Sequence, residues 1–253
     1  MTGFMVLLRK ELLEQWRTTR LPVVATVFLL VGLSSPLLAR FTPEILQAVG
    51  GSQFSLTLPT PTAADAYDQL AKNVGQFGAL IAVLLAMGSV ATEKERGTAA
   101  LILTKPAGRG ALIVAKLTAI AATLGVATVI AAAGGWFYTL VLFQPLDVAG
   151  FAAATVLTWL ALVAFAAITL LGSTLTRSAV AAAGIGLVAF VVIGIVSVVP
   201  GVGPYLPTGL GAPARALALG LPGADALGPT VAAVVLIVAL VAISWLAFRD
   251  QEL

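Results

Sequence analysis

The sequence contains no cysteine and no histidine, and charged side chains are scarce. Without cysteine the chain forms no disulfide and has no thiolate metal ligand or thiol nucleophile. Without histidine it lacks the commonest zinc and haem ligand and the commonest general base near neutral pH. The 14 Lys and Arg with the 11 Asp and Glu make 25 charged residues among 253, too few to cover a soluble domain. Most of the surface must therefore face something other than water.

Long apolar runs take the place of the missing charge. Hydrophobic residues make up 60% of the chain, and the mean hydropathy is +1.06. About 20 apolar residues in a helix cross a hydrocarbon core of about 30 Å. The sequence therefore predicts an all-α integral membrane protein, a single transmembrane domain over residues 1–253. Its six transmembrane helices are expected at Leu21–Ala39, Val74–Ala91, Ala111–Phe143, Val148–Thr176, Ser178–Val199 and Gly228–Phe248.

The distribution of basic residues predicts an orientation. Loops on the cytoplasmic side carry an excess of Lys and Arg. With the N-terminus inside, 11 basic residues lie on the inner side and 3 on the outer side, which accounts for all 14. We expect a multi-pass protein of the cell (plasma) membrane with both termini in the cytoplasm. The outer three are Arg40, Lys72 and Arg215, and the inner residues include Arg177 and Arg249.

The N-terminal segment has the pattern of an amphipathic helix. Phe4, Met5, Leu8, Leu12 and Trp16 recur at near-helical spacing, while Arg9, Lys10, Glu11, Glu14 and Arg17 supply charge around them. The pattern predicts a helix in the plane of the membrane interface, with the chain turning into the bilayer at Pro22. A solvated anchor on the cytoplasmic side is the alternative interpretation.

Two outer segments lie between the predicted spans. Thr42–Lys72 is expected to be a loop with a short helix at Thr62–Leu70. Pro200–Pro229 is rich in Pro and Gly but nearly uncharged, and Pro213–Leu221 has the Pro and Gly positions of a short capped helix. Irregular uncharged backbone of this kind predicts a re-entrant segment before helix 6, sheltered by other helices. A plain surface loop is the alternative.

The chain lacks the motifs of an enzyme. It has no histidine or cysteine catalytic group and no Gly-x4-Gly-Lys-Ser/Thr phosphate loop. We expect no cofactor, no bound metal, no nucleic-acid partner and no catalysis by this chain. With Lys116 counted in the inner segment, the spans are expected to hold no charge, which disfavours an ion-coupled carrier.

The segment from Thr92 to Lys116, TEKERGTAALILTKPAGRGALIVAK, is the most informative stretch. Thr92 is expected to cap a short helix whose first turn holds Glu93 and Glu95, where the helix dipole favours negative charge. Pro106 and Gly108 then end the segment before the next span. A short helix lying across the ends of two membrane helices would act as a lever, because pressure on it moves both.

This segment resembles the first intracellular loop of permeases, the membrane subunits of the type 2 ABC exporter family. That loop has an acidic pair, Gly-Thr, a leucine run, Pro, Arg and Lys. The Leu8-Arg-Lys-Glu-Leu12 stretch followed by Trp16-Arg17 similarly resembles the family's interface helix. The resemblance implies a separate ATP-binding cassette subunit that drives the permease through a cytoplasmic coupling helix between helices 2 and 3. The residues it implies for coupling are Glu93, Glu95, Arg96, Gly97, Thr98, Pro106 and Arg109, and those for the interface helix are Arg9, Lys10, Glu11, Trp16 and Arg17.

We therefore interpret the chain as the permease subunit of an ATP-driven exporter, paired with itself as a homodimer or with a homologous permease in the lipid bilayer. The small residues at Ala181–Gly186 are a candidate dimer seam. A pathway lined by such residues favours an apolar or amphipathic cargo, or a mechanical task without cargo. The alternatives are a secondary transporter or channel, and a non-transporting assembly or mechanotransmission factor.

Overall fold

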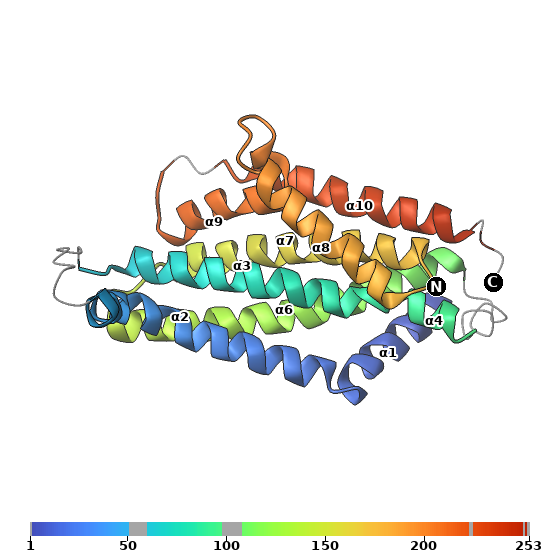
Figure 1. Ribbon diagram of the computed structural model, residues 1–253, viewed down its shortest axis with the longest axis horizontal. Helices are drawn as coiled ribbons and strands as arrows, with labels where there is room; N and C mark the ends of the chain where they lie inside the picture. Colours follow the sequence, from blue (N-terminus) through green and yellow to red (C-terminus); the bar gives the residue numbers. More distant parts are fainter. Residues whose placement is uncertain (1, 51–59, 98–107, 223–224, 250, 252–253) are drawn as a thin grey trace.

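The computed structural model describes residues 2–50, 60–97, 108–222, 225–249 and 251, and these form an all-α bundle (Figure 1). Six helices are long and apolar enough to span a membrane, as predicted. They are α2 (Arg20–Gly50), α3 (Ala63–Met87), α6 (Arg109–Leu142), α7 (Val148–Leu175), α8 (Ala179–Val196) and α10 (Leu227–Arg249). The shorter elements are α1 (Thr2–Arg17), α4 (Ala91–Glu95), η2 (Gly203–Tyr205), η3 (Pro207–Leu210) and α9 (Gly211–Ala218). No strand occurs in the described ranges, and the predicted fold class is confirmed.

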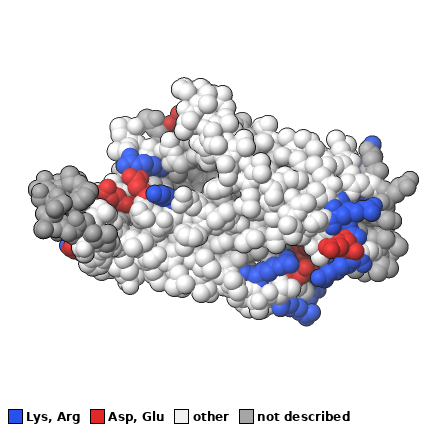
Figure 2. Space-filling view, viewed as in Figure 1, with Lys and Arg blue, Asp and Glu red and all other residues white. Residues whose placement is uncertain are grey.

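The charged residues gather at the two ends of the bundle and leave a broad uncharged band between them (Figure 2). Both chain ends lie near the same end of the bundle, beside α1 and α4 (Figure 1). We call this the terminal end and the opposite one the distal end. An uncharged band closed by charge at both edges is the surface that a bilayer requires.

Three helices form the interior and three cover it. Over their most apolar stretches, 56% of the residues of α6 and α7 are buried, against 17% in α10 and 11% in α8. Val180, Val188 and Val235 are among the large apolar side chains that α8 and α10 leave exposed. Lipid or another membrane subunit must cover these faces, because water would not favour them.

The predicted corner at Pro22 is wrong. The chain turns at Thr18 and Thr19, where Thr19 adopts a positive φ of 58°. The Thr18 hydroxyl donates to the carbonyl of Glu14 at 2.6 Å, which satisfies an acceptor at the end of α1. Pro22 lies in the first turn of α2, where a missing backbone N–H costs nothing.

The described parts of the predicted outer loop Thr42–Lys72 are largely helical. Helix α2 runs on to Gly50 with Pro36 and Pro43 inside it. The predicted short helix at Thr62–Leu70 is instead the start of α3, fixed by a reciprocal capping box between Thr62 and Asp65. The two spans were predicted to end next to charged residues, but the end of a helix depends on how its terminal backbone groups are capped.

The segment before α10 folds back onto the bundle. Helix α9 packs along α7, and Leu210, Ala214 and Ala218 are buried. A Schellman motif ends α9, with the N–H of Leu221 bonded to the carbonyl of Ala216 at 2.8 Å and Gly220 at a positive φ of 63°. The helix begins at Gly211, two residues before the predicted Pro213. This sheltered packing is the arrangement expected of a re-entrant segment, and it differs from a plain surface loop.

The candidate seam at Ala181–Gly186 is divided between two surfaces. Ala182 and Gly186 face the interior, and a Cβ on Gly186 would lie 2.4 Å from the hydroxyl of Thr169. Ala181 and Gly184 face outward, and nothing lies within 4 Å of a Cβ on Gly184. Two of the five small residues are therefore used for packing within the chain.

Close approach of α2 and α6 yields a test of the packing. A Cβ on Gly32 would lie 2.4 Å from the carbonyl oxygen of Ala131. We expect Gly32→Ala to lower the free energy of unfolding by about 1–3 kcal/mol, because backbone must move to admit the methyl group. Thermal unfolding of the detergent-solubilised protein measures the change. Gly184→Ala, in open space, is the matched control, and equal effects of both substitutions would contradict this packing.

Candidate functional site

The segments assigned to coupling and to the interface meet at the terminal end of the bundle (Figure 1). Glu93 and Glu95 lie in α4, Arg96 and Gly97 follow it directly, and Arg109 begins α6. Thr98 and Pro106 lie outside the described residues. Helix α1 packs along α6, so that both segments contact the same membrane helix.

Helix α4 is held by a hydroxyl from another helix. The Ser173 hydroxyl of α7 accepts the backbone N–H groups of Val90 and Ala91 at 3.1 and 2.9 Å. The predicted cap at Thr92 is therefore wrong, because Val90 occupies the cap position and Thr92 lies within the helix. A buried helix start needs acceptors for its free N–H groups, and tertiary packing supplies one here.

A charged cluster joins α1, α4 and α6, and we define it as Lys10, Glu11, Glu93 and Lys116. The Lys116 ammonium lies 3.0 Å from Glu11 Oε1 and 2.8 Å from Glu93 Oε1. The side chain of Lys116 is 3% exposed and that of Glu11 is 8% exposed, so these charges are desolvated. A single buried ammonium thus ties a carboxylate of the interface helix to a carboxylate of α4.

Lys10 closes the cluster from the solvent side. Its ammonium lies 3.0 Å from Glu11 Oε1 and 3.2 Å from Glu93 Oε1. Burial acts to lower the pKa of Lys10, but the hydrogen bonds and charges of Glu11 and Glu93 outweigh it and hold that pKa above the usual lysine range. The cluster balances two ammonium groups against two carboxylates, as buried charge requires.

Lys116 lies seven residues into α6, within the stretch predicted as a span, although it was counted among the inner residues. Its contacts with Glu11 and Glu93 place it at the terminal end of that helix. Lysine in an apolar run needs a partner, and that signal in the sequence pointed to nearby acids. Which acids, on α1 and α4, only the packing reveals.

Lys94 and Arg109 bind the exposed ends of two membrane helices. The Lys94 ammonium donates to the carbonyl of Thr174 at the end of α7. Arg109 donates to the carbonyls of Phe248 and Gln251 at 3.1 Å each, at the end of α10. Both cations also lie within 6 Å of the buried Phe248 ring. Cations at helix C-termini stabilise the free carbonyls, so both side chains brace the bundle.

Other predicted residues point outward. Glu95, Arg96 and Gly97 are exposed beyond the charged cluster. On α1, Arg9 and Arg17 are exposed, as is Trp16 with 63% of its surface. The exposed apolar side chains of α1 include Met5, Leu12 and Trp16, which is the surface an interface helix presents to a membrane.

A polar cleft opens beside the charged cluster. It encloses about 980 Å³, counting its mouth, and its lining includes Lys10, Glu14, Gln15, Arg96 and Lys116. The Gln15 side-chain oxygen is buried in its wall and accepts no hydrogen bond from the described residues. Sequence analysis missed Gln15, because only the packing of α1 on α6 buries it.

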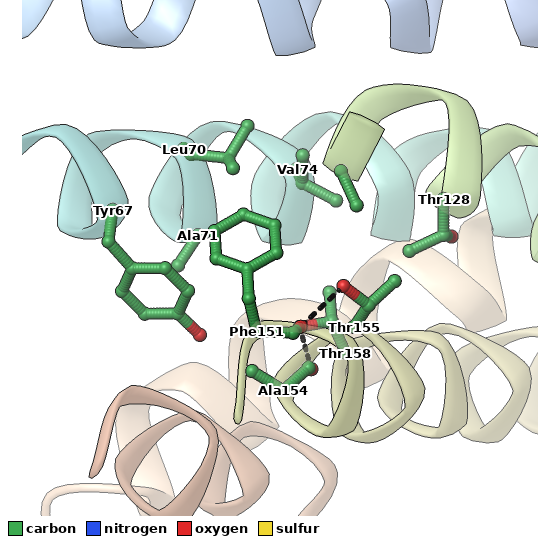
Figure 3. Close-up of a pocket in the computed structure, with 10 residues that line it drawn as sticks. Tyr67, Leu70, Ala71, Val74, Thr128, Phe151, Ala154, Thr155 and Thr158 are labelled. Atoms are coloured by element: carbon green, nitrogen blue, oxygen red, sulfur yellow. Dashed lines mark hydrogen bonds between the residues drawn. The ribbon is translucent and has the colours of Figure 1, made fainter. Parts of the chain in front are cut away.

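A small pocket inside the bundle is mostly apolar (Figure 3). Its lining is apolar apart from Tyr67 and three threonines. The hydroxyl of Thr155 donates to the carbonyl of Phe151 at 2.8 Å and that of Thr158 to Ala154 at 3.0 Å, within their own helix. Hydroxyls engaged in this way are poor binders of a polar ligand, so the pocket is a packing gap.

Removing Lys116 tests the charged cluster. Lys116→Met would remove the buried ammonium that contacts Glu11 and Glu93, and would leave Lys10 as the one ammonium group of the cluster. We expect a loss of about 3–5 kcal/mol of stability, measured by chemical unfolding in micelles. Lys10→Met, at the solvent side, should cost under about 1 kcal/mol. Adding Glu11→Gln to Lys116→Met should recover part of the loss, and a Lys116→Met protein as stable as Lys10→Met would contradict the cluster's role.

Comparisons with known proteins agree with this architecture. A family model described as "ABC-2 family transporter protein" matches residues 5–253. The chain is 32% identical over 263 residues to a Bacillus subtilis (strain 168) protein named "Uncharacterized transmembrane protein YxlG", with 100% of this chain and 99% of that protein covered. The match covers the interface segment, the six long helices and the segment between α3 and α6. It confirms the resemblance seen in the sequence. The chain belongs to the ABC-2 family of transporter proteins.

Proposed function

We propose that this chain is the permease subunit of an ABC exporter and receives force from a separate ATP-binding subunit at its terminal end. Membership of the ABC-2 transporter family supports the permease role. The observation that carries the proposal is the charged cluster, in which Lys116 of α6 binds Glu11 of α1 and Glu93 of α4. It fastens both candidate docking segments to one membrane helix.

The cluster makes these three elements a mechanical unit. Moving α4 away from α1 would separate Lys116 from Glu93 or from Glu11, and an uncompensated buried charge costs several kcal/mol. A push on α4 therefore favours joint displacement of α1 and the start of α6 over separation. Because Lys94 of α4 is bonded to the end of α7, a displacement of α4 would also move that end. Arg109 at the start of α6 would likewise move the end of α10.

The outward-facing residues supply the docking surface. Glu95, Arg96 and Gly97 are exposed after the cluster, and the polar cleft with its unpartnered Gln15 oxygen lies beside them. A partner segment that donates hydrogen bonds would satisfy Gln15. The chain shows no phosphate loop, so ATP hydrolysis falls to the partner.

Lys116 also supports a second candidate function. Ion-coupled carriers use an ionisable group inside a span, and Lys116 is such a group. It lies only about 10 Å along α6 from the helix start, at 1.5 Å per residue, and is paired with two acids. That position suits an anchor better than a coupling site at the middle of the membrane.

In the proposed orientation the terminal end is cytoplasmic, at the plasma membrane. The terminal end holds most of the basic residues, which supports this placement. The exposed apolar faces of α8 and α10 would meet lipid and a second permease, either another copy of this chain or a homologue.

Cysteine labelling tests the orientation. The chain has no native cysteine, so single introduced cysteines report without background. Thr60→Cys should react with a membrane-impermeant maleimide in intact cells, because Thr60 is exposed at the distal end. Arg177→Cys, exposed at the terminal end, should react only after lysis. Labelling of Arg177→Cys in intact cells would show that the topology is the reverse of the one proposed.

Reversing Glu95 tests the docking surface. Glu95→Lys should leave insertion and folding intact, since the side chain is exposed. Docking to the ATPase should weaken by about 2–5 kcal/mol if that contact excludes water, and by under about 1 kcal/mol if it stays wet. Co-purification with the ATPase and ATP turnover of the complex measure the effect.

The control for Glu95 must avoid residues that brace the bundle. The sequence alone favoured Lys94→Glu, on the expectation that Lys94 points to water, but Lys94 binds the end of α7. Glu44→Lys is better matched, because Glu44 is an exposed acid on α2 at the distal end. Should Glu95→Lys bind the ATPase and transport as well as Glu44→Lys does, the docking role of this segment is wrong.

A further inference from the structure

A second, larger pocket lies in the distal half of the bundle. Helices α3, α7 and α8 form its walls, and η3 with the start of α9 covers it. It encloses about 880 Å³, counting its mouth and the open space in front of it. Figure 2 shows this face hollowed beside a small group of basic and acidic residues.

The floor of this distal pocket is apolar and its rim is polar. Leu162 and Phe165 of α7 are buried at the floor, and Leu210 of η3 is buried in the cover. Lys72 and Gln76 are exposed at the rim on α3. Lys72 lies just before the uncharged stretch of α3 that begins at Asn73, which is where a bilayer's headgroups would meet its hydrocarbon.

The acids near the rim already have partners. Asp68 binds Arg215 of α9 at 2.7 Å, and this ion pair fastens the cover of the pocket to α3. Asp65 accepts from Thr62 in the capping box at the start of α3. Among the described residues Lys72 forms no ion pair, so its positive charge is available to a ligand.

A second group in the pocket lacks a partner. Tyr67 is 5% exposed and lines the pocket, and its hydroxyl forms no hydrogen bond with the described residues. Its ring packs edge-on against Phe151 at 5.8 Å, and in Figure 3 the hydroxyl points away from α3. The hydroxyl oxygen is not enclosed by packed atoms, so it can donate a hydrogen bond to an oxygen-bearing ligand in the pocket.

We infer that the distal pocket is a binding site for an anionic phospholipid of the surrounding membrane. The acyl chain would lie on the apolar floor, the Lys72 ammonium would meet the phosphate, and the Tyr67 hydroxyl would donate to an ester or phosphate oxygen. The inference is independent of the proposed ATPase coupling, since the pocket and the cluster lie at opposite ends of the bundle. Lipid binding can therefore fail while coupling stands, and the reverse holds as well.

One glycine allows the pocket to be filled. Gly75 lines the pocket, and a Cβ there would meet nothing within 4 Å. Gly75→Leu would therefore place its Cβ in open space, and its larger side chain would reduce the room for a ligand. Gly184→Leu is the matched control, because Gly184 is equally open but lies outside the pocket.

The test uses the intact purified chain in phosphatidylcholine vesicles with a trace of photoactivatable phosphatidylglycerol. We expect cross-links to α3 and α7 within the pocket, and unlabelled phosphatidylglycerol should compete for them. Gly75→Leu should reduce this labelling to the level on the outer face of α10, and Gly184→Leu should not. Lys72→Ala should reduce the preference for phosphatidylglycerol over a photoactivatable phosphatidylcholine about fivefold, since one lysine near anionic lipid contributes about 1 kcal/mol.

Charge and hydroxyl variants complete the design. Arg40→Ala removes an exposed cation from the same end but outside the pocket, and should leave the lipid preference unchanged. Tyr67→Phe should weaken labelling by both lipids while keeping the fold. Equal labelling by the two lipids in the unaltered chain, or labelling that Gly75→Leu does not reduce, would overturn the inference and identify ordinary boundary lipid. Protection of the pocket by a second copy of the chain would overturn it as well.

Discussion

The buried ion pairs of Lys116 set the arrangement of the whole terminal end. An ammonium that is 3% exposed can persist only with carboxylates in contact, and Glu11 and Glu93 provide them from separate elements. This requirement fixes the position of α1 and α4 on α6, and hence the direction in which Glu95 and Arg96 face. The same end is braced by Lys94 and Arg109, which satisfy the free carbonyls of α7 and α10. The terminal end therefore holds most of the ion pairs, and it is also where the proposed ATPase would dock.

Elsewhere the bundle depends on close packing. In lipid, apolar surface gains little by leaving the solvent, so helices associate through shape and small residues. Gly32 against Ala131 and Gly186 against Thr169 are examples in which one added methyl group would collide. Because α8 and α10 bury so little of their apolar surface, they are the helices free to meet lipid or a second permease.

The distal end combines the same two kinds of interaction for a different purpose. The Arg215–Asp68 ion pair fastens α9 over a pocket whose floor is apolar. It also engages the acid nearest to Lys72, so that a lysine at the rim keeps its charge for a ligand. The chain thus has charged contacts at both ends, one set holding helices together and the other framing an apolar cavity.

The sequence by itself determined the fold class, the six long apolar helices and the family, because lipid demands uncharged runs of a minimum length. It also marked the segments after Thr92 and before Trp16 as candidate functional segments. It marked the helix start at Thr62 but not that this helix continues into the next span, and it did not show that Ser173 of α7 caps α4. Nor did it pair Lys116 with Glu11 and Glu93, which are 105 and 23 residues away. Pairing at such separations, and the choice of Lys94 as a brace where water was expected, follow from three-dimensional packing, because local patterns fix which residues share a helix face and not which faces meet.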